Sequence, residues 1–202
     1  TTSMSTIEVA ANQSGSLISE FRKYFNQAVS TGQGVYKSYL IRNRPQDAVR
    51  IRALQQLLDR NGIRYEQATA GPVKGVHYAT GKETMITAQA GDLVISTLQP
   101  RAAMVTVLFE PRTKLADTVT YDITAWSLPY AYGLDAIASK DKIASQPVIQ
   151  EGEKRSFVRS TYGYAIPWDG LPAVRLATSI GKAGIVLRYA EQPFTVAGKS
   201  FA

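Results

Sequence analysis

The sequence has no cysteine and a single histidine, His77, among its 202 residues. Without cysteine the chain can form no disulfide, no thiolate metal site and no cysteine nucleophile. It has no run of eighteen apolar residues, so we expect no membrane span. The first residues lack the charged, apolar and small-residue order of an export signal, and the start at Thr1 has the character of a cut in a longer chain. These absences predict a soluble segment.

The single histidine also limits catalysis. A catalytic zinc site needs at least three protein ligands, usually His and Glu, and no partner histidine is available for His77. Ser127 follows an expected strand, but Ala125 and Pro129 stand where a nucleophile elbow needs glycines, and a triad would require His77 as its base. We therefore predict no catalytic, cofactor-binding or metal-binding residue in this chain, and an independent hydrolase is a remote alternative.

The composition predicts a folded domain, and the distribution of charge predicts no nucleic-acid partner. Hydrophobic residues make up 45% of the chain, enough for one large domain or two small ones. The net charge is +7, and seven basic residues fall between Lys37 and Arg64. Acidic residues are interleaved with them, and no recognition motif accompanies them. We expect solvated helix faces in this region.

Residues 5–30 are predicted to form a helix at the start of the chain. Ser5 and Glu8 fit a capping box, and Gly15 weakens the middle enough to split the helix. Gly32 and Gly34 are expected to end it. Apolar residues recur at helical spacing, so this face should be buried against another part of the protein; they are Leu17, Phe21, Tyr24, Phe25 and Ala28.

Two segments, 36–68 and 162–190, show the same order of strand, turn, helix and strand. Each predicts a βαβ unit, whose crossover makes its two strands parallel. Gly62-Ile63 in the first segment matches Gly184-Ile185 in the second, which suggests a duplication within one sheet. Convergent βαβ patterning is the alternative. The second unit stops one strand short of the first, so we expect a truncated second repeat.

Four residues in turns are candidates for ligand binding. Asp122 can cap a helix starting at Ile123, with Trp126 packed in the core and Pro129 cutting the helix short before Gly133. Trp168 and Asp169 lie in the strand-to-helix turn of the second repeat, where Asp169 can cap the next helix. The alternative for Asp122, Trp126, Trp168 and Asp169 is contact with a ligand at the carboxyl edge of the sheet.

Two stretches have a residue order that a generic amphipathic pattern would not produce. They are GDLVISTLQP at residues 91–100 and YDITAWSLPYAYGL at residues 121–134. Together they resemble the region downstream of the catalytic domain in large bacterial zinc carboxypeptidases of the M14 family. The resemblance covers most of residues 35–202. It implies a three-layer α/β fold with a mostly parallel sheet and helices on both faces, similar to the glutamine amidotransferase-like and flavodoxin-like folds, preceded by a helical N-terminal segment.

The resemblance also implies that different parts of the parent protein have different roles. Residues 1–34 would be a helical connector from a preceding catalytic domain, and residues 35–202 an α/β accessory domain that supports proteolysis without catalysing it. Zinc and hydrolase activity would belong to the parent protein, which is expected to be periplasmic or secreted. The partner would be the peptidase domain of the same polypeptide. A module that binds peptide, glycan or cell-wall fragments is the alternative function.

Overall fold

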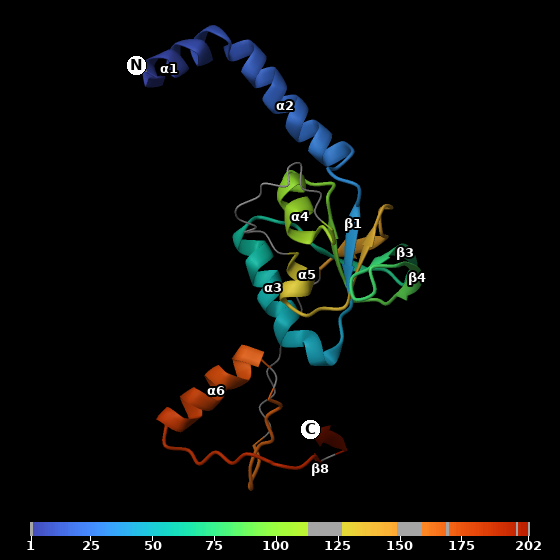
Figure 1. The fold of residues 1–202 in the computed structure, drawn as a ribbon, viewed down its shortest axis with the longest axis vertical. Helices are drawn as coiled ribbons and strands as arrows, with labels where there is room; N and C mark the ends of the chain where they lie inside the picture. The colour runs from blue at the N-terminus through green and yellow to red at the C-terminus, as the bar shows by residue number, and fades with distance from the viewer. Residues whose placement is uncertain (1, 113–126, 149–158, 169, 197, 202) are drawn as a thin grey trace. The chain divides into compact units, whose positions relative to one another are not determined.

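In the computed structural model of this protein, the described residues are 2–112, 127–148, 159–168, 170–196 and 198–201. They belong to two compact units, Thr1–Gln150 and Glu151–Ala202. The first unit contains a seven-stranded sheet, and the second contains one helix and a small two-stranded sheet (Figure 1). Among these residues, no helix is both long and apolar enough to cross a lipid bilayer.

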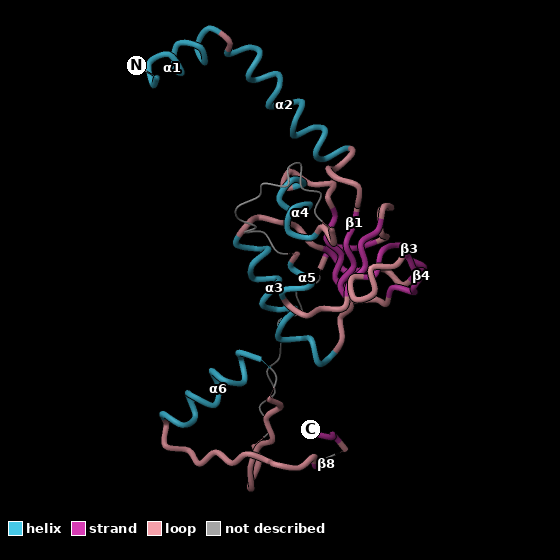
Figure 2. Tube along the Cα trace, viewed as in Figure 1, coloured by secondary structure: helices cyan, strands magenta, loops and turns pink. Residues whose placement is uncertain are grey.

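The large sheet is antiparallel throughout, in the order β4-β3-β6-β1-β5-β2-β7. Its strands are β1 (Ser38–Ile41), β2 (Glu66–Ala68), β3 (Gly71–His77), β4 (Glu83–Ala88), β5 (Leu93–Ser96), β6 (Ala136–Ser139) and β7 (Ser145–Pro147). The prediction of a mostly parallel, three-layer α/β sheet with a glutamine amidotransferase-like or flavodoxin-like arrangement is therefore wrong. Instead the sheet is curled into a half-barrel with helices beside it (Figure 2).

The position of β5 explains why the parallel prediction fails. The predicted order of strand, helix and strand over residues 36–68 is present as β1, α3 (Ala48–Arg60) and β2. However, β5 lies between β1 and β2 and pairs antiparallel with both. The two strands of the βαβ pattern thus run in the same direction without touching. Spacing along the chain predicts their direction but cannot reveal a strand inserted from elsewhere.

The short link between β2 and β3 accounts for the curl of the sheet. Only two residues separate the end of β2 at Ala68 from the start of β3 at Gly71, yet three strands lie between β2 and β3 in the sheet order. A flat sheet would hold them apart, because neighbouring strands are about 4.8 Å apart. The sheet must therefore bend until β2 and β3 approach each other at one end.

Both faces of the sheet are covered, in keeping with the unbroken apolar character of its central strands. Every residue of β1 and β6 is buried. One cluster, on the side of the helices, contains Tyr39, Ile41, Leu93, Ile95, Ala136 and Ala138 from the strands. A second cluster, on the opposite side, contains Leu40, Val94, Ile137, Val73, Ala88, Ala68 and Ile143. Alternate residues of each strand thus enter different cores.

Helices α3, α4 (Ala102–Phe109) and α5 (Leu128–Ala131) lie on one side of the sheet (Figure 2). The helix α3 buries Ile51, Leu54 and Leu58 at helical spacing, and α4 buries Val105 and Phe109. A short 3-10 turn, η1 (Pro45–Asp47), leads into α3. These side chains complete the first cluster.

The strand β3 approaches its neighbour so closely that it requires a glycine. A Cβ atom on Gly75 would lie 2.4 Å from the Ala138 carbonyl oxygen of β6. By contrast, a Cβ atom on Gly71 in the same strand would meet no atom within 4 Å. Gly75 is thus the residue that lets β3 and β6 pair.

The N-terminal segment is helical, as predicted, and is divided near Gly15. It forms α1 (Thr2–Asn12) and α2 (Ser14–Ser30), with Gln13 between them. The helix starts before Ser5, so the predicted capping box there is wrong. At the far end Gly32 has a φ of 67°, and a Cβ atom on it would lie 2.6 Å from Thr97 Oγ1. The close contact between Gly32 and Thr97 fixes the position at which the chain passes from α2 to the sheet.

Pro129 has the opposite role from the one predicted. Ser127 precedes α5, and Pro129 lies within its first turn. A proline there costs little because its missing N–H would have no partner within the helix. The helix therefore begins beside Pro129 and ends before Gly133, whose φ is 59°. The predicted cap at Asp122 and helix start at Ile123 lie outside the described residues.

The second unit does not repeat the first. It contains α6 (Gly170–Lys182), β8 (Phe194–Val196) and β9 (Lys199–Phe201), the last two forming an antiparallel pair. The predicted helix is present, but residues 163–166 and 184–187 are not strands. The predicted second βαβ repeat at 162–190, and with it the duplication, is therefore wrong. Matching glycines and apolar residues on either side of a helix were insufficient to make strands.

Candidate functional site

Among the described residues, a group of charged side chains in contact surrounds the only histidine. It contains Arg44, Asp47, Arg50, His77 and Asp135, and we refer to it as the ion-pair cluster. Arg44 precedes η1, Asp47 ends η1, Arg50 lies in the first turn of α3, His77 ends β3, and Asp135 precedes β6. The spacing of three residues places both arginines beside Asp47. The antiparallel sheet brings the ends of β1 and β3 to the start of β6.

Asp47 is at the centre of this cluster, with a fully buried side chain. Its carboxylate accepts from Arg44 Nε at 2.8 Å and from an Arg50 guanidinium nitrogen at 2.5 Å. Arg50 also donates to the Gly133 carbonyl at 3.0 Å. The hydrogen bond to Asp47 raises the pKa of the Arg44 guanidinium above its ordinary value. A buried carboxylate held by two arginines ties η1 and α3 to the loop before β6.

Both ring nitrogens of His77 are already engaged. Its Nε2 lies 3.0 Å from a carboxylate oxygen of Asp135, and its Nδ1 accepts from the Ala79 backbone N–H at 3.2 Å. The backbone donor requires an unprotonated Nδ1, so Nε2 carries the proton donated to Asp135. Neither nitrogen is presented to Ser127. This arrangement orients the ring within the structure and provides no free base.

The ion-pair cluster does not fit a zinc site. Zinc binds the unprotonated nitrogen of a histidine, but the one on His77 accepts the Ala79 N–H, and Asp135 also contacts Arg44 at 3.4 Å. Within the part of the chain that the structure describes, no three His, Cys, Asp or Glu side chains are grouped to hold a metal ion. The chemistry of these residues is ion pairing.

A second polar group lies inside the first hydrophobic cluster. The Tyr78 hydroxyl donates to the Phe109 carbonyl, and Ser127 is its side-chain neighbour. The Tyr39 hydroxyl is buried and has no hydrogen-bond partner among the described residues. Burial raises the pKa of both Tyr39 and Tyr78 well above the ordinary range. Both hydroxyls therefore stay protonated, and the hydroxyl oxygen of the partly buried Ser127 is itself shielded from solvent.

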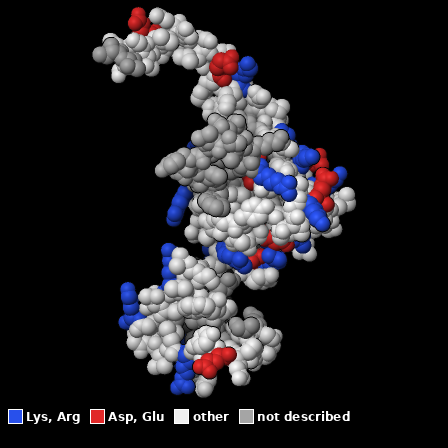
Figure 3. Space-filling model, in the orientation of Figure 1, with Lys and Arg blue, Asp and Glu red and all other residues white. Residues whose placement is uncertain are grey.

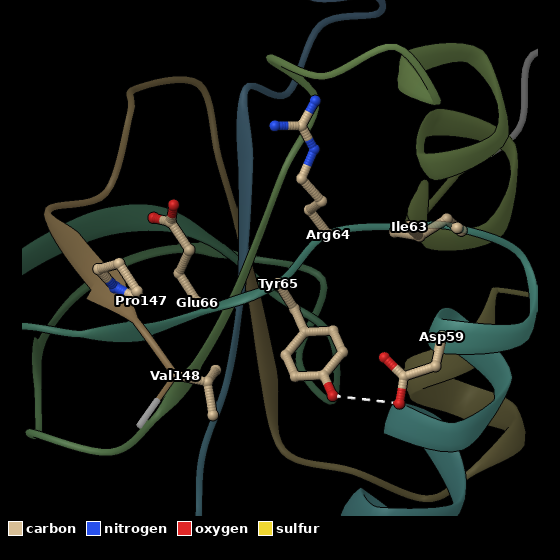
Figure 4. A pocket seen from close by; sticks show the side chains of 8 residues that line it. Asp59, Ile63, Arg64, Tyr65, Glu66, Pro147 and Val148 are labelled. Carbon is tan, nitrogen blue, oxygen red and sulfur yellow. Dashed lines mark hydrogen bonds between the residues drawn. The ribbon is translucent and has the colours of Figure 1, made fainter. Parts of the chain in front are cut away.

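A shallow, open pocket of about 520 Å³ lies between the end of α3 and the β2 and β7 strands (Figure 4). The Tyr65 ring stands in its middle, and its hydroxyl lies 3.4 Å from Asp59. Arg64 and Glu66 line the pocket with opposite charges. Burial, with the nearby Asp59 carboxylate, raises the pKa of Tyr65. The mixed charges and open shape favour no particular ligand.

The most conspicuous uncovered surface of the first unit is on α2. Four residues spaced three or four apart, Leu17, Phe21, Tyr24 and Ala28, make one apolar face that we name the α2 stripe. Phe21 is 65% exposed, whereas Ala28 at the end joining the sheet is fully buried. Figure 3 shows few charges along α1 and α2 on the visible face. The predicted apolar face is therefore present, but among the described residues the predicted burial is found only at Ala28.

Of the four residues predicted to contact a ligand, the structure describes Trp168 alone. Trp168 lies in the second unit, outside any helix or strand, and is 67% exposed. Asp122, Trp126 and Asp169 lie outside the described residues. The structure thus brings none of the four together in a described site.

The ion-pair cluster was missed by sequence reasoning, although one signal was available. Arg44, Asp47 and Arg50 are spaced by three at the start of a predicted helix, and such spacing places side chains side by side. Their link to His77 and Asp135 depends on the pairing of distant strands, which the sequence does not reveal. Comparisons of this chain with family models, with curated proteins and with solved structures find no match.

Proposed function

We propose that this chain is a non-catalytic accessory domain of a bacterial M14-type zinc carboxypeptidase-like protein. Its role would be to pack against a peptidase domain of the same polypeptide and so support proteolysis there. The proposal starts from the resemblance of residues 91–100 and 121–134 to the post-catalytic region of that family. The antiparallel sheet departs from the fold which that resemblance implies, so the support from the structure comes from surfaces and side-chain contacts.

The α2 stripe is the observation that carries the proposal. Leu17, Phe21 and Tyr24 form an apolar face with exposed fractions between 44% and 65%. Covering a side chain such as Leu or Phe contributes about 1.5 to 3 kcal/mol, so an uncovered row of them favours association. Because the same row ends in the buried Ala28, a neighbouring domain that covered it would continue the packing of this unit.

The engaged histidine supports placing the chemistry elsewhere. Peptide hydrolysis by zinc needs ligands with free lone pairs and an open coordination position. His77 uses one nitrogen on Asp135 and the other on Ala79. Under this proposal zinc, the activated water and the substrate carboxylate are all bound by the preceding domain. The parent protein is accordingly proposed to be periplasmic or secreted.

An assay of C-terminal residue release tests the proposal. The purified 202-residue chain is incubated with peptide substrates, alone and together with the polypeptide encoded ahead of Thr1. We expect no turnover by the chain alone, and turnover sensitive to chelator when the preceding polypeptide is present. His77→Ala serves as the control and should leave the second activity unchanged. Turnover by the chain alone that disappears in His77→Ala would contradict the proposal.

A further inference from the structure

The strand β4 is the free edge of the seven-stranded sheet. It pairs with β3 on one side, and no described residue forms a strand on its other side. In Figure 1 the β3–β4 hairpin lies at the outer margin of the sheet. An edge strand presents unpaired N–H and C=O groups in a row, which makes it a template for another strand.

The register of the hairpin identifies which groups point outward. The backbone N–H of His77 donates to the backbone carbonyl of Lys82 at 3.0 Å, so these two residues, which lie opposite each other, form a hydrogen-bonded pair. In an antiparallel ladder every second pair is of this kind, which assigns Thr84, Ile86 and Ala88 to the bonds with β3. The intervening residues, Glu83, Met85 and Thr87, therefore direct their backbone groups away from β3.

The features that usually block an edge are weak in β4. Proline removes a donor and protects the other edge, where β7 ends at Pro147. The six residues of β4 contain no proline. Glu83 is the one charged residue in β4, and its contact with Lys74 is 3.7 Å long between two exposed side chains. Met85, at the centre of the outward row, is 69% exposed and apolar.

We propose that β4 pairs antiparallel with β4 of a second copy of this chain, about a twofold axis that passes beside Met85. In this register Met85 lies opposite Met85 of the second copy, and Glu83 lies opposite Thr87. The outward N–H and C=O groups of the row then face those of the other copy. The Thr87 carbonyl already accepts from Arg42 of its own copy, and its second lone pair accepts the N–H of Glu83 of the other copy. The two methionine side chains come to the same face of the combined sheet and cover each other.

Charge complementarity favours a second copy over an unrelated strand. The Arg42 guanidinium donates to the Thr87 carbonyl at 2.7 Å and pairs with Asp92 at 3.1 Å. Arg42 is thereby held at the end of β4 where Thr87 lies. In the proposed register Glu83 of one copy lies opposite Thr87 of the other, so its carboxylate meets Arg42 of that copy. The twofold axis makes the same ion pair twice.

Sedimentation of the full chain over a range of concentrations tests the pairing. Since the contact is small, we expect a weak dimer with a Kd on the order of 10 to 100 μM. Met85→Pro removes an outward N–H without touching the bonds to β3, and Met85→Lys places two like charges together; each should raise the Kd at least about tenfold. Met104→Lys, on the exposed side of α4, is the matched control and should leave the Kd unchanged.

Hydrogen exchange of the amides provides the second readout, which holds even if Met85→Pro fails to fold. The amides of Met85 and Thr87 should exchange more slowly as the wild-type concentration rises, and should lose this dependence in Met85→Lys. A chain that remains monomeric at millimolar concentration would overturn the pairing. So would a dimer that persists in Met85→Lys but is lost in Phe21→Glu, since the α2 stripe would then be the contact.

Discussion

The two units of this chain use similar helices in different ways. In the first unit α3 packs Ile51, Leu54 and Leu58 into a hydrophobic core, and strands of the seven-stranded sheet supply the other side of that core. In the second unit α6 is also amphipathic, yet the residues described there include a single buried hydrophobic side chain, Ala173. The exposed apolar residues of α6 are Leu171, Val174 and Leu176. Among the described residues of this unit, none buries these three side chains of α6.

The comparison shows that the formation of a helix and the burial of its apolar face have different causes. Apolar residues at helical spacing predict α2, α3 and α6 equally well, because the period is a property of the local sequence. Whether that face is buried depends on strands from distant parts of the chain. The described residues of their own units leave most of the apolar faces of α2 and α6 exposed, so a partner that covered these faces could add stability.

The largest expected effect contrasts the two helices directly. Leu54→Ala, at a fully buried position of α3, should lower the free energy of unfolding by about 2 to 5 kcal/mol by leaving a cavity. Leu176→Ala, at a position of α6 that is 45% exposed, should lower it by less than about 1 kcal/mol. Denaturant unfolding of both variants measures this. Equal losses would mean that α6 has a core of its own.

A second pair of variants compares two positions of β3. Gly75→Ala should cost about 1 to 3 kcal/mol, because the new Cβ would collide with the backbone of β6 at Ala138. Gly71→Ala, in the same strand but with open space around it, should be close to neutral. Thermal melts are sufficient. A neutral Gly75→Ala would contradict the close approach of β3 and β6 and hence the strand order.

Alkaline pH should weaken the sheet unit more than the second unit. Burial raises the pKa of Tyr39 and Tyr78 in the folded chain, so above about pH 10 the unfolded chain loses these protons first. Stability is therefore full below pH 10 and falls as the pH rises, by about 1 to 3 kcal/mol at pH 11 for the two groups together. Absorbance of tyrosinate during unfolding follows this. Titration of Tyr39 and Tyr78 near pH 10 in the folded chain would contradict this prediction.

The smallest effect distinguishes the two buried tyrosines. Tyr78→Phe removes the donor to the Phe109 carbonyl and should cost about 1 kcal/mol. Tyr39→Phe removes a hydroxyl that has no partner among the described residues, and should leave stability unchanged or slightly raise it. Equilibrium unfolding compares them. A larger loss for Tyr39→Phe would reveal a partner for its hydroxyl.

Several helices were predictable from the sequence, but the β3–β4 hairpin and the assembly of the sheet were not. Periodicity predicted α3 and α6, and the break of the first helix near Gly15 was also correct. The parallel sheet was wrong, because a strand inserted between β1 and β2 leaves no mark in the segment 36–68. The repeat at 162–190 was wrong for a related reason. Short apolar runs become strands only where a neighbouring strand is available to pair with them.

The charged site was missed because its parts are distant in sequence. His77 and Asp135 meet only through the pairing of β3 with β6. The prediction that this chain holds no catalytic, cofactor-binding or metal-binding residue rests on counts of residue types, which need no fold. The apolar face of α2 was predicted from periodicity, but its exposure depends on what the rest of the unit fails to cover.

Binding of this chain to the polypeptide encoded ahead of Thr1 tests the central claim, that the α2 stripe packs against a peptidase domain. Two variants place a carboxylate on α2, Phe21→Glu on the stripe and Ser19→Glu on the opposite side of the helix. We predict by calorimetry that Phe21→Glu weakens binding at least about tenfold, while Ser19→Glu binds like the wild type. Equal binding by both variants, or no binding by the wild type, would contradict the claim.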